Sequence, residues 1–213
     1  MNLSLDFENT GSRTLHSCIE KAMDDDSHIE NMTFENEDLT EYDISCMEFE
    51  KVRFVKCDFK KCTFSRSRFY DAEFINCNIS LSDFSKTFWK KVTIHESSAV
   101  GIKCVEGIIK EAKITKSILD YANFSNASLE NCLFDDCKFT ESYFAETKIK
   151  KLQLKKILFT GTDFFKTSLK GLDLSDCLID GIKISADFFE LRGAKINAQQ
   201  AVDLITLFNI EVV

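Results

Sequence analysis

The sequence predicts an all-β solenoid, a chain that winds through short extended pieces around one axis. The main observation is a five-residue period that runs from Ile29 to Phe189 through 33 positions, of which 30 are Phe, Ile or Leu. The frame one residue later holds only two such residues, Ile75 and Phe165. A second observation is that the chain has no proline, so every backbone N–H is available for hydrogen bonds between stacked coils.

A period of five is incompatible with either regular structure on its own. In an α-helix, a step of five residues turns by roughly 140°, which would scatter the large apolar side chains around the helix. In a continuous strand the side chains alternate, so an odd period would send successive members to opposite faces. One short extended piece and one bend in each repeat bring all the central residues onto one axis.

The central residues of the repeats are the candidate core of this tube. The position two residues before each centre shares its face, and among 32 such positions only Glu37 and Asp187 are charged. Large side chains at the centre and small ones beside them suit a narrow, dry interior, with the charged residues outside. The phenylalanines assigned to the core are Phe49, Phe54, Phe59, Phe64, Phe69, Phe74, Phe84, Phe124, Phe134, Phe139, Phe144, Phe159 and Phe164.

One stretch of the register is weaker than the rest. Ala99 and Cys104 replace large centres there, and Gly101 and Gly107 lie close by. We expect a waist at this level, at which the column changes direction or diameter.

The chain divides into three segments of one domain. Residues 1–28 leave the register and predict an N-terminal cap that contains a short helix begun by Ser12, with Leu15, Cys18, Ile19 and Ala22 on one face. Residues 29–190 form the coils, and residues 191–213 form a C-terminal cap. Within that cap, Asn197 can begin a helix from Ala198 to about Phe208.

The best repeats identify a known family. Tyr121-Ala122-Asn123-Phe124-Ser125, Ser82-Asp83-Phe84 and Asp71-Ala72-Glu73-Phe74 resemble the pentapeptide repeat family, whose loose consensus is A(D/N)LXX. The resemblance implies a right-handed quadrilateral parallel β-helix with four repeats in each coil. It then predicts about eight coils and a rod on the order of 40 Å long at the strand spacing of about 4.8 Å.

Two segments are similar to the Qnr branch of that family, the fluoroquinolone-resistance proteins. They are Ser98-Ala99-Val100-Gly101-Ile102 and Leu119-Asp120-Tyr121-Ala122-Asn123-Phe124-Ser125. The likeness implies binding to DNA gyrase or topoisomerase IV. Qnr proteins of Gram-negative bacteria carry two loops that break the five-residue count. This count is unbroken, so the chain resembles the loop-free Qnr-like and MfpA proteins, and we expect weaker quinolone protection than a looped Qnr gives.

The same resemblance gives the C-terminal helix a role. An amphipathic helix at this place could simply cap the last coil, but in Qnr and MfpA the equivalent helix builds a symmetric dimer. We therefore expect a homodimer. The residues assigned to its interface are Ala201, Leu204, Ile205, Phe208, Ile210 and Val212.

The formal net charge of −8 is unevenly distributed along the chain. Residues 1–50 hold 14 acids and two bases, whereas residues 51–100 hold five acids and ten bases. An acidic rod as wide as a duplex can compete for a cationic DNA-binding groove, and ordinary solvated acids are the alternative interpretation. The candidate partner-binding acids are Asp24, Asp25, Asp26, Asp135, Asp136, Glu141 and Glu146.

A basic patch argues against uniform DNA mimicry. It consists of Lys51, Arg53, Lys56, Lys60, Lys61, Arg66 and Arg68. No aromatic-interleaved motif accompanies it, so sequence-specific nucleic-acid binding is not predicted. The competing hypothesis is a structural or scaffolding repeat protein with another protein partner.

No motif predicts catalysis. The three histidines, His16, His28 and His95, are scattered, and nucleotide, nucleophile and zinc-protease motifs are absent. Most of the nine cysteines occupy core positions and none forms a CxxC pair, so we predict neither a metal nor a cofactor. Without an apolar run or signal peptide, a cytoplasmic, non-membrane protein is expected.

Overall fold

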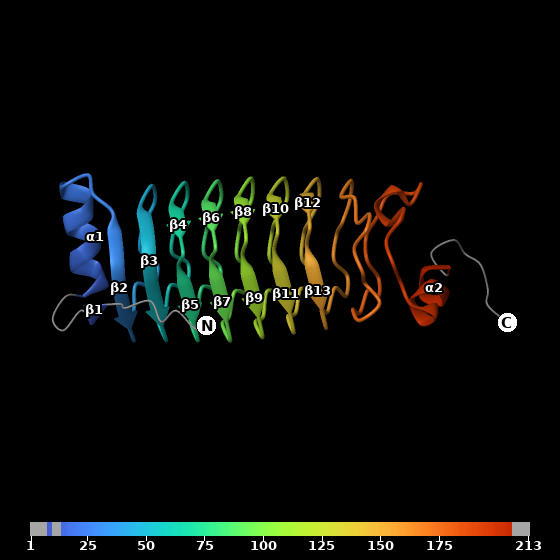
Figure 1. Cartoon of the computed structure of the whole chain (residues 1–213), viewed down its shortest axis with the longest axis horizontal. Coiled ribbons are helices and arrows are strands. Elements are labelled where there is room, and N and C mark those ends of the chain that lie inside the picture. Colours follow the sequence, from blue (N-terminus) through green and yellow to red (C-terminus); the bar gives the residue numbers. More distant parts are fainter. Residues whose placement is uncertain (1–7, 10–13, 206–213) are drawn as a thin grey trace, which may run out of the picture.

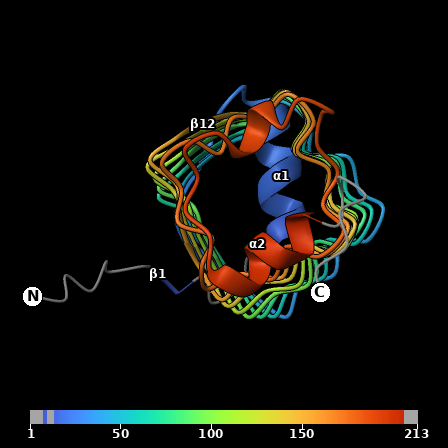
Figure 2. The ribbon, with the colours of Figure 1, turned by 90° about the vertical axis from the view of Figure 1, so that its right-hand side faces the viewer.

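The computed structural model describes residues 8–9 and 14–205. The chain forms a straight column of stacked coils with a short helix at each end (Figure 1). Viewed along the column, successive coils overlay on one four-sided outline (Figure 2). The column continues from β7 (Thr93–His95) to β8 (Ile108–Lys110) without a change of direction (Figure 1). Ala99 and Cys104 lie between these strands in the sequence, and both are fully buried. The expected bend at this level is therefore wrong.

The elements follow one another in a repeating order. The chain begins with β1 (Glu8–Asn9), α1 (Leu15–Asp24), β2 (Ile29–Glu35) and β3 (Glu48–Val55). The next strands have three residues each: β4 (Arg68–Tyr70), β5 (Glu73–Ile75), β6 (Phe88–Lys90), β7 (Thr93–His95), β8 (Ile108–Lys110), β9 (Lys113–Thr115), β10 (Ser128–Glu130), β11 (Leu133–Asp135), β12 (Lys148–Lys150) and β13 (Gln153–Lys155). A 3-10 helix, η1 (Phe189–Leu191), and α2 (Ala198–Ile205) complete the described chain.

All the strands pair in parallel, and from β2 onward they do so with a constant offset. Phe49 of β3 pairs with Phe69 of β4, and Phe54 of β3 pairs with Phe74 of β5, so twenty residues make one turn. The ladder continues by the same offset from β4 to β12 on one side and from β5 to β13 on the next. The structure is an all-parallel solenoid of about six turns, slightly fewer than the eight expected, and its last regular strand ends at Lys155.

The central side chains fill the column and stack on their equivalents one coil away. Each of the thirteen phenylalanines assigned to the core is at most 3% exposed. The rings of Phe49 and Phe69 lie 5.0 Å apart and 8° from parallel, and those of Phe124 and Phe144 lie 5.0 Å apart and 9° from parallel. The repeat of twenty residues therefore brings like side chains into contact and fixes the register of the coils.

The inward position two residues before each centre has a specific polar function. Its thiol or hydroxyl donates a hydrogen bond to a carbonyl 23 residues earlier, as from Cys62 to Leu39 (2.8 Å) and from Ser142 to Leu119 (2.8 Å). Thr147 makes the same bond to Phe124 (2.8 Å). This explains why Cys, Ser and Thr alternate there with Ala and Val: each is small, and each donor serves a buried carbonyl. Burial raises the pKa of the Cys62 thiol to about 11.

Each bend of the coil contains a residue in the left-handed backbone region. Every fifth residue from Asp26 to Gly171 has φ between 48° and 81°. Most are Lys, Glu, Asn or Asp, and the ladder stabilises them: the corner N–H groups of Lys61 and Tyr121 each donate to a carbonyl one coil ahead, at 2.9 Å. The fold thus holds ordinary residues in a conformation that usually favours glycine.

The five-residue register ends before Phe189. Asp163 pairs with Lys183 at the usual offset of twenty, but Asp173 pairs with Lys195, which is 22 residues later. The two extra residues lie between Lys183 and Glu190, so Phe189, expected at a core centre, is 43% exposed and the side chain of Glu190 is buried instead. The expectation of an unbroken count to Phe189 is therefore wrong.

Glu190 is buried within a set of hydrogen bonds. Its carboxylate accepts from the backbone N–H of Lys166 (2.7 Å) and from the Ser185 hydroxyl (2.7 Å) and backbone N–H (3.1 Å). Burial alone would raise the pKa of this carboxyl, but these hydrogen bonds outweigh it and hold the pKa below its usual value.

No helix within the described ranges is long and apolar enough to cross a membrane.

Candidate functional surfaces

The N-terminal helix covers the first coil and carries an acidic tip. Thr14 begins α1, and its hydroxyl oxygen accepts a hydrogen bond from the Ser17 N–H at 3.2 Å; Ser12, expected in this role, lies outside the described residues. The side chains of Leu15, Ile19 and Ala22 are buried. The helix ends in three exposed acids, Asp24, Asp25 and Asp26.

Several acids near this end have no basic partner. In the chain from 14 to 205, neither Lys nor Arg forms an ion pair with the six acids that we call the acidic end: Asp24, Asp25, Asp26, Glu35, Asp38 and Asp43. The backbone N–H and hydroxyl of Thr40 donate to Asp38 and lower the pKa of its carboxyl.

Three of the seven residues in the basic patch at residues 51–68 form ion pairs with the neighbouring coils. Arg53 pairs with Glu73 at 2.7 Å, Lys61 with Glu41 at 2.6 Å and Arg68 with Glu48 at 3.5 Å. Each of these pairs is twenty residues apart, which is one turn of the solenoid. The sequence does contain information on these ion pairs, because oppositely charged residues recur at a spacing of twenty. A comparison of residues that are neighbours in the sequence does not reveal it.

The second group of candidate acids is spread around one coil. Asp136, Glu141 and Glu146 occupy three successive corners, each with positive φ. Glu141 forms an ion pair with Lys183 at 2.8 Å and Glu146 one with Lys166 at 3.3 Å. Asp135 is half-buried at the end of β11. The four carboxylates therefore do not form one continuous surface, and two of them are neutralised.

Exposed lysines gather on the coil that contains β12 and β13. Lys148, Lys151, Lys155 and Lys156 are exposed, and none of the ion pairs found in the described part of the chain involves them. We call these four residues the lysine collar. The column therefore has an acidic end and, several coils away, a cationic level that the sequence analysis missed.

The C-terminal helix docks on the last coil through a polar residue. Asn197 and Gln200 cap α2 reciprocally, with backbone-to-side-chain bonds of 2.9 and 2.8 Å. The Gln200 amide also donates to the carbonyls of Leu174 (2.8 Å) and Cys177 (2.6 Å). Gln200 thus satisfies carbonyls at the open end of the ladder.

The expected dimer residues lie in different surroundings. Leu204 is buried within the chain itself, whereas Ala201 and Ile205 are half-buried. Val202, on the same helix, is 37% exposed. The remaining interface residues, Phe208, Ile210 and Val212, lie outside the described residues.

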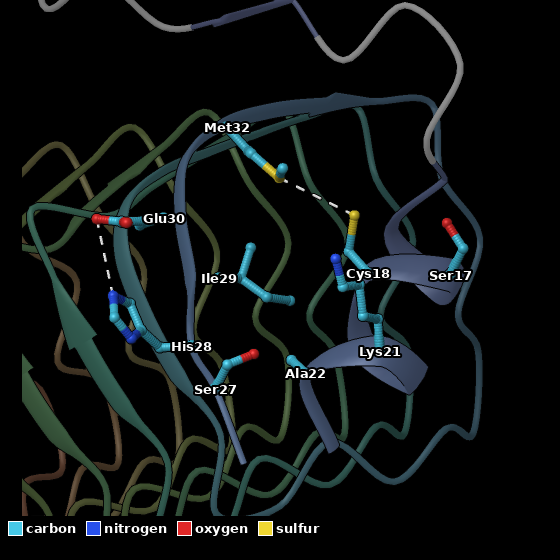
Figure 3. Close-up of a pocket in the computed structure, with 9 residues that line it drawn as sticks. All are labelled: Ser17, Cys18, Lys21, Ala22, Ser27, His28, Ile29, Glu30 and Met32. Atoms are coloured by element: carbon cyan, nitrogen blue, oxygen red, sulfur yellow. Dashed lines mark hydrogen bonds and ion pairs between the residues drawn. The ribbon is translucent and has the colours of Figure 1, made fainter. Parts of the chain in front are cut away.

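A pocket of about 400 Å³ lies between α1 and β2 (Figure 3). Cys18 and Lys21 contribute from the helix, and His28, Glu30 and Met32 from the strand side. The thiol of Cys18 lies 3.9 Å from the Met32 sulfur. On the strand side, His28 Nε2 lies 3.7 Å from a Glu30 oxygen. The pocket thus has an apolar, sulfur-containing side and a charged rim.

Two family models match the coils. Residues 107–184 match the pentapeptide repeat region, and residues 48–86 match pentapeptide repeats (8 copies). The two matches together cover more than half of the chain. No curated protein matches the sequence.

One solved structure supports the fold. A trypsin-treated form of QnrB1, described as a plasmid-mediated fluoroquinolone resistance protein, is 24% identical over 88% of this chain and 92% of its own, with a TM-score of 0.51. Full-length QnrB1 is 25% identical over 86% and 91%, with a TM-score of 0.43. HetL, from the cyanobacterium Nostoc sp., is 12% identical over 86% and 92%, with a TM-score of 0.29. With pentapeptide repeats matched in both parts of its solenoid, this chain belongs to the pentapeptide repeat proteins.

Proposed function

We propose that this protein binds a type II topoisomerase, DNA gyrase or topoisomerase IV, through a DNA-like acidic surface and thereby lowers quinolone susceptibility. The observation that carries the proposal is the straight solenoid, whose fold resembles that of a fluoroquinolone resistance protein over most of both chains. The protein acts by binding and not by catalysis. A cytoplasmic location follows from the same proposal, because the partner acts on chromosomal DNA.

The acids without a described Lys or Arg partner support a DNA-like field at the N-terminal end. Duplex DNA carries one negative charge for about every 1.7 Å of its axis, and a DNA-binding groove is cationic to match. The acidic end offers six carboxylates without a Lys or Arg partner in the described chain. By contrast, Glu141 and Glu146 are already paired with lysines, so they contribute less to such a field. We therefore place the primary contact at the acidic end.

A dimer would extend this surface. We infer that α2 contributes to a symmetric interface together with the segment that follows it, since Val202 is exposed on a helix whose other side is docked. The interface would contain Ala201 and Ile205, followed by Phe208, Ile210 and Val212. Light scattering on the full chain and on a variant that lacks residues 206–213 tests it. A monomeric full chain, or a truncated chain that remains dimeric, would contradict this assignment.

Gyrase supercoiling, with and without ciprofloxacin, tests the function. The wild-type protein should inhibit supercoiling or relieve ciprofloxacin-stabilised cleavage. Reversal of Asp24, Asp25 and Asp26 to Lys should remove the effect and leave the fold intact, because all three are exposed. The matched control is reversal of Asp135 and Asp136, which should retain most of the activity.

The outcome also separates the proposal from a scaffold role. No binding, inhibition or rescue by the wild-type protein would reject topoisomerase binding. If both sets of reversals weakened the effect equally, a specific contact at the acidic end would be wrong and overall charge would be the cause. High salt should weaken the interaction in either electrostatic case.

A further inference from the structure

Three metal-ligating side chains converge where the first coil meets the second. The ligand atoms of His28, Glu30 and Glu50 all lie within 4.8 Å of one another. His28 and Glu30 flank the first central residue, Ile29, and Glu50 follows the equivalent residue, Phe49. Two of these residues, His28 and Glu30, also line the pocket and lie close together, and a dashed line marks their ion-pair contact (Figure 3).

The strand ladder brings the three groups together. Glu30 of β2 is the direct parallel partner of Glu50 in β3, next to the pairing of Ile29 with Phe49. Ile29 and Phe49 are 3% and 1% exposed, so the core fixes the backbone beneath the cluster. Like charges that face each other on adjacent strands destabilise a sheet. A cation between the two carboxylates would remove this repulsion.

We propose that His28, Glu30 and Glu50 form a surface site for a divalent transition-metal ion of the zinc type. One imidazole nitrogen and two carboxylate oxygens are a donor set that suits Zn²⁺, with solvent completing the coordination. Metal–ligand bonds of about 2.0–2.2 Å require the three atoms to approach by roughly an ångström. Their side chains are between 38% and 53% exposed, which leaves room for this movement.

The existing contacts of the cluster are compatible with a metal. His28 Nε2 lies 3.7 Å from a Glu30 oxygen, so an ion could bind between the facing imidazole nitrogen and carboxylate oxygen. Glu50 also contacts the ammonium of Lys51 at 3.3 Å through one oxygen, and its carboxylate has a second oxygen for the metal. The neighbouring pocket admits solvent to the open coordination positions. A bound ion would also reduce the negative charge near the acidic end.

Calorimetric titration of the full chain with Zn²⁺, in the absence of chelators, tests the site. The wild-type protein should bind one ion and gain thermal stability with added zinc. His28→Gln and Glu50→Gln should each weaken zinc affinity at least about tenfold. The matched control is Glu35→Gln, the same charge change on another exposed glutamate of β2, which should bind as the wild type does.

A Co²⁺ titration identifies the ligand atoms. Nitrogen and oxygen ligands should give only weak visible bands. A strong near-ultraviolet sulfur-to-cobalt band would place the ion on a thiol such as the exposed Cys46 and overturn the proposal. Wild-type protein without stoichiometric zinc binding, or His28→Gln with unchanged affinity, would also overturn it.

Discussion

Glu141 and Lys183 form an ion pair of 2.8 Å although 42 residues separate them. They belong to coils that are two turns apart, and the coil between them contributes Gly161 at the crossing point. A Cβ built on Gly161 would collide with a Glu141 carboxylate oxygen. The Glu141 side chain thus occupies the space that Gly161 leaves, and a Cβ there would displace it, whereas Lys and Glu adopt the same left-handed φ at the other corners.

Gly161→Ala should destabilise the protein more than Gly171→Ala. Both glycines have positive φ, but nothing lies within 4 Å of a Cβ at Gly171. Gly171→Ala should cost about 1 kcal/mol, the usual penalty of an L-residue in this backbone region. Gly161→Ala should add the loss of the Glu141–Lys183 contact. Chemical denaturation of both variants measures the difference, and equal losses would contradict the steric role.

Truncation of a central phenylalanine should be far more costly than truncation of an outward one. Phe139→Ala should lower the free energy of unfolding by about 3–5 kcal/mol because it leaves a cavity in a close-packed column. Phe59→Ala should behave alike, since both rings are fully buried. The control is Phe165→Ala, because Phe165 is 42% exposed. A loss at Phe139 no larger than that at Phe165 would be inconsistent with a packed interior.

The inward thiols should tolerate serine better than alanine. Cys62 donates to the Leu39 carbonyl, and Ser82, its equivalent one coil later, donates to Phe59 at 2.5 Å. Cys62→Ser keeps the donor, whereas Cys62→Ala removes it and should cost about 1 kcal/mol more. Thermal unfolding of the two variants at one pH gives the comparison. Equal stability would mean that the hydrogen bond contributes nothing net.

Acid should selectively weaken the C-terminal end of the column. The folded-state pKa of Glu190 lies below its ordinary value of 4.5, so its stabilising contribution is complete above that pH. It is lost as the pH falls through the folded pKa. Glu190→Gln should therefore be less stable than the wild type at neutral pH, and the gap should narrow in acid. Urea denaturation of both proteins from neutral pH to pH 3 checks the trend; a constant gap would contradict it.

The sequence predicts the solenoid because one buried side chain in every five leaves a pattern that neither helix nor strand can produce. It also indicates a helix at each end, although the N-terminal cap is Thr14 and not Ser12. The slip at Phe189 could not be read from apolar spacing, since Phe189 itself fits the register. Only the ladder, which pairs Asp173 with Lys195, reveals the two extra residues.

The surface was harder to predict than the core. Charges lie next to residues twenty or more positions away, so Arg53 meets Glu73 and Glu141 meets Lys183. A count of charges by segment identifies the acidic end, but it overstates the net positive charge of the basic patch. The proximity of His28, Glu30 and Glu50 likewise depends on which coil lies above which. Writing the sequence in rows of twenty residues would place most of these neighbours one above the other before any coordinates are known.

Because equivalent residues of neighbouring coils are twenty apart, the solenoid can become longer or shorter only by whole turns. Removing or duplicating one whole turn of twenty residues from the middle of the column would leave the core phenylalanines facing inward. The residues with left-handed backbone angles would also remain at the bends. Deleting a single residue there would shift all the later centres out of register until one inserted residue restored the count. Such a molecule can change its reach in steps of about 4.8 Å without redesigning its interior.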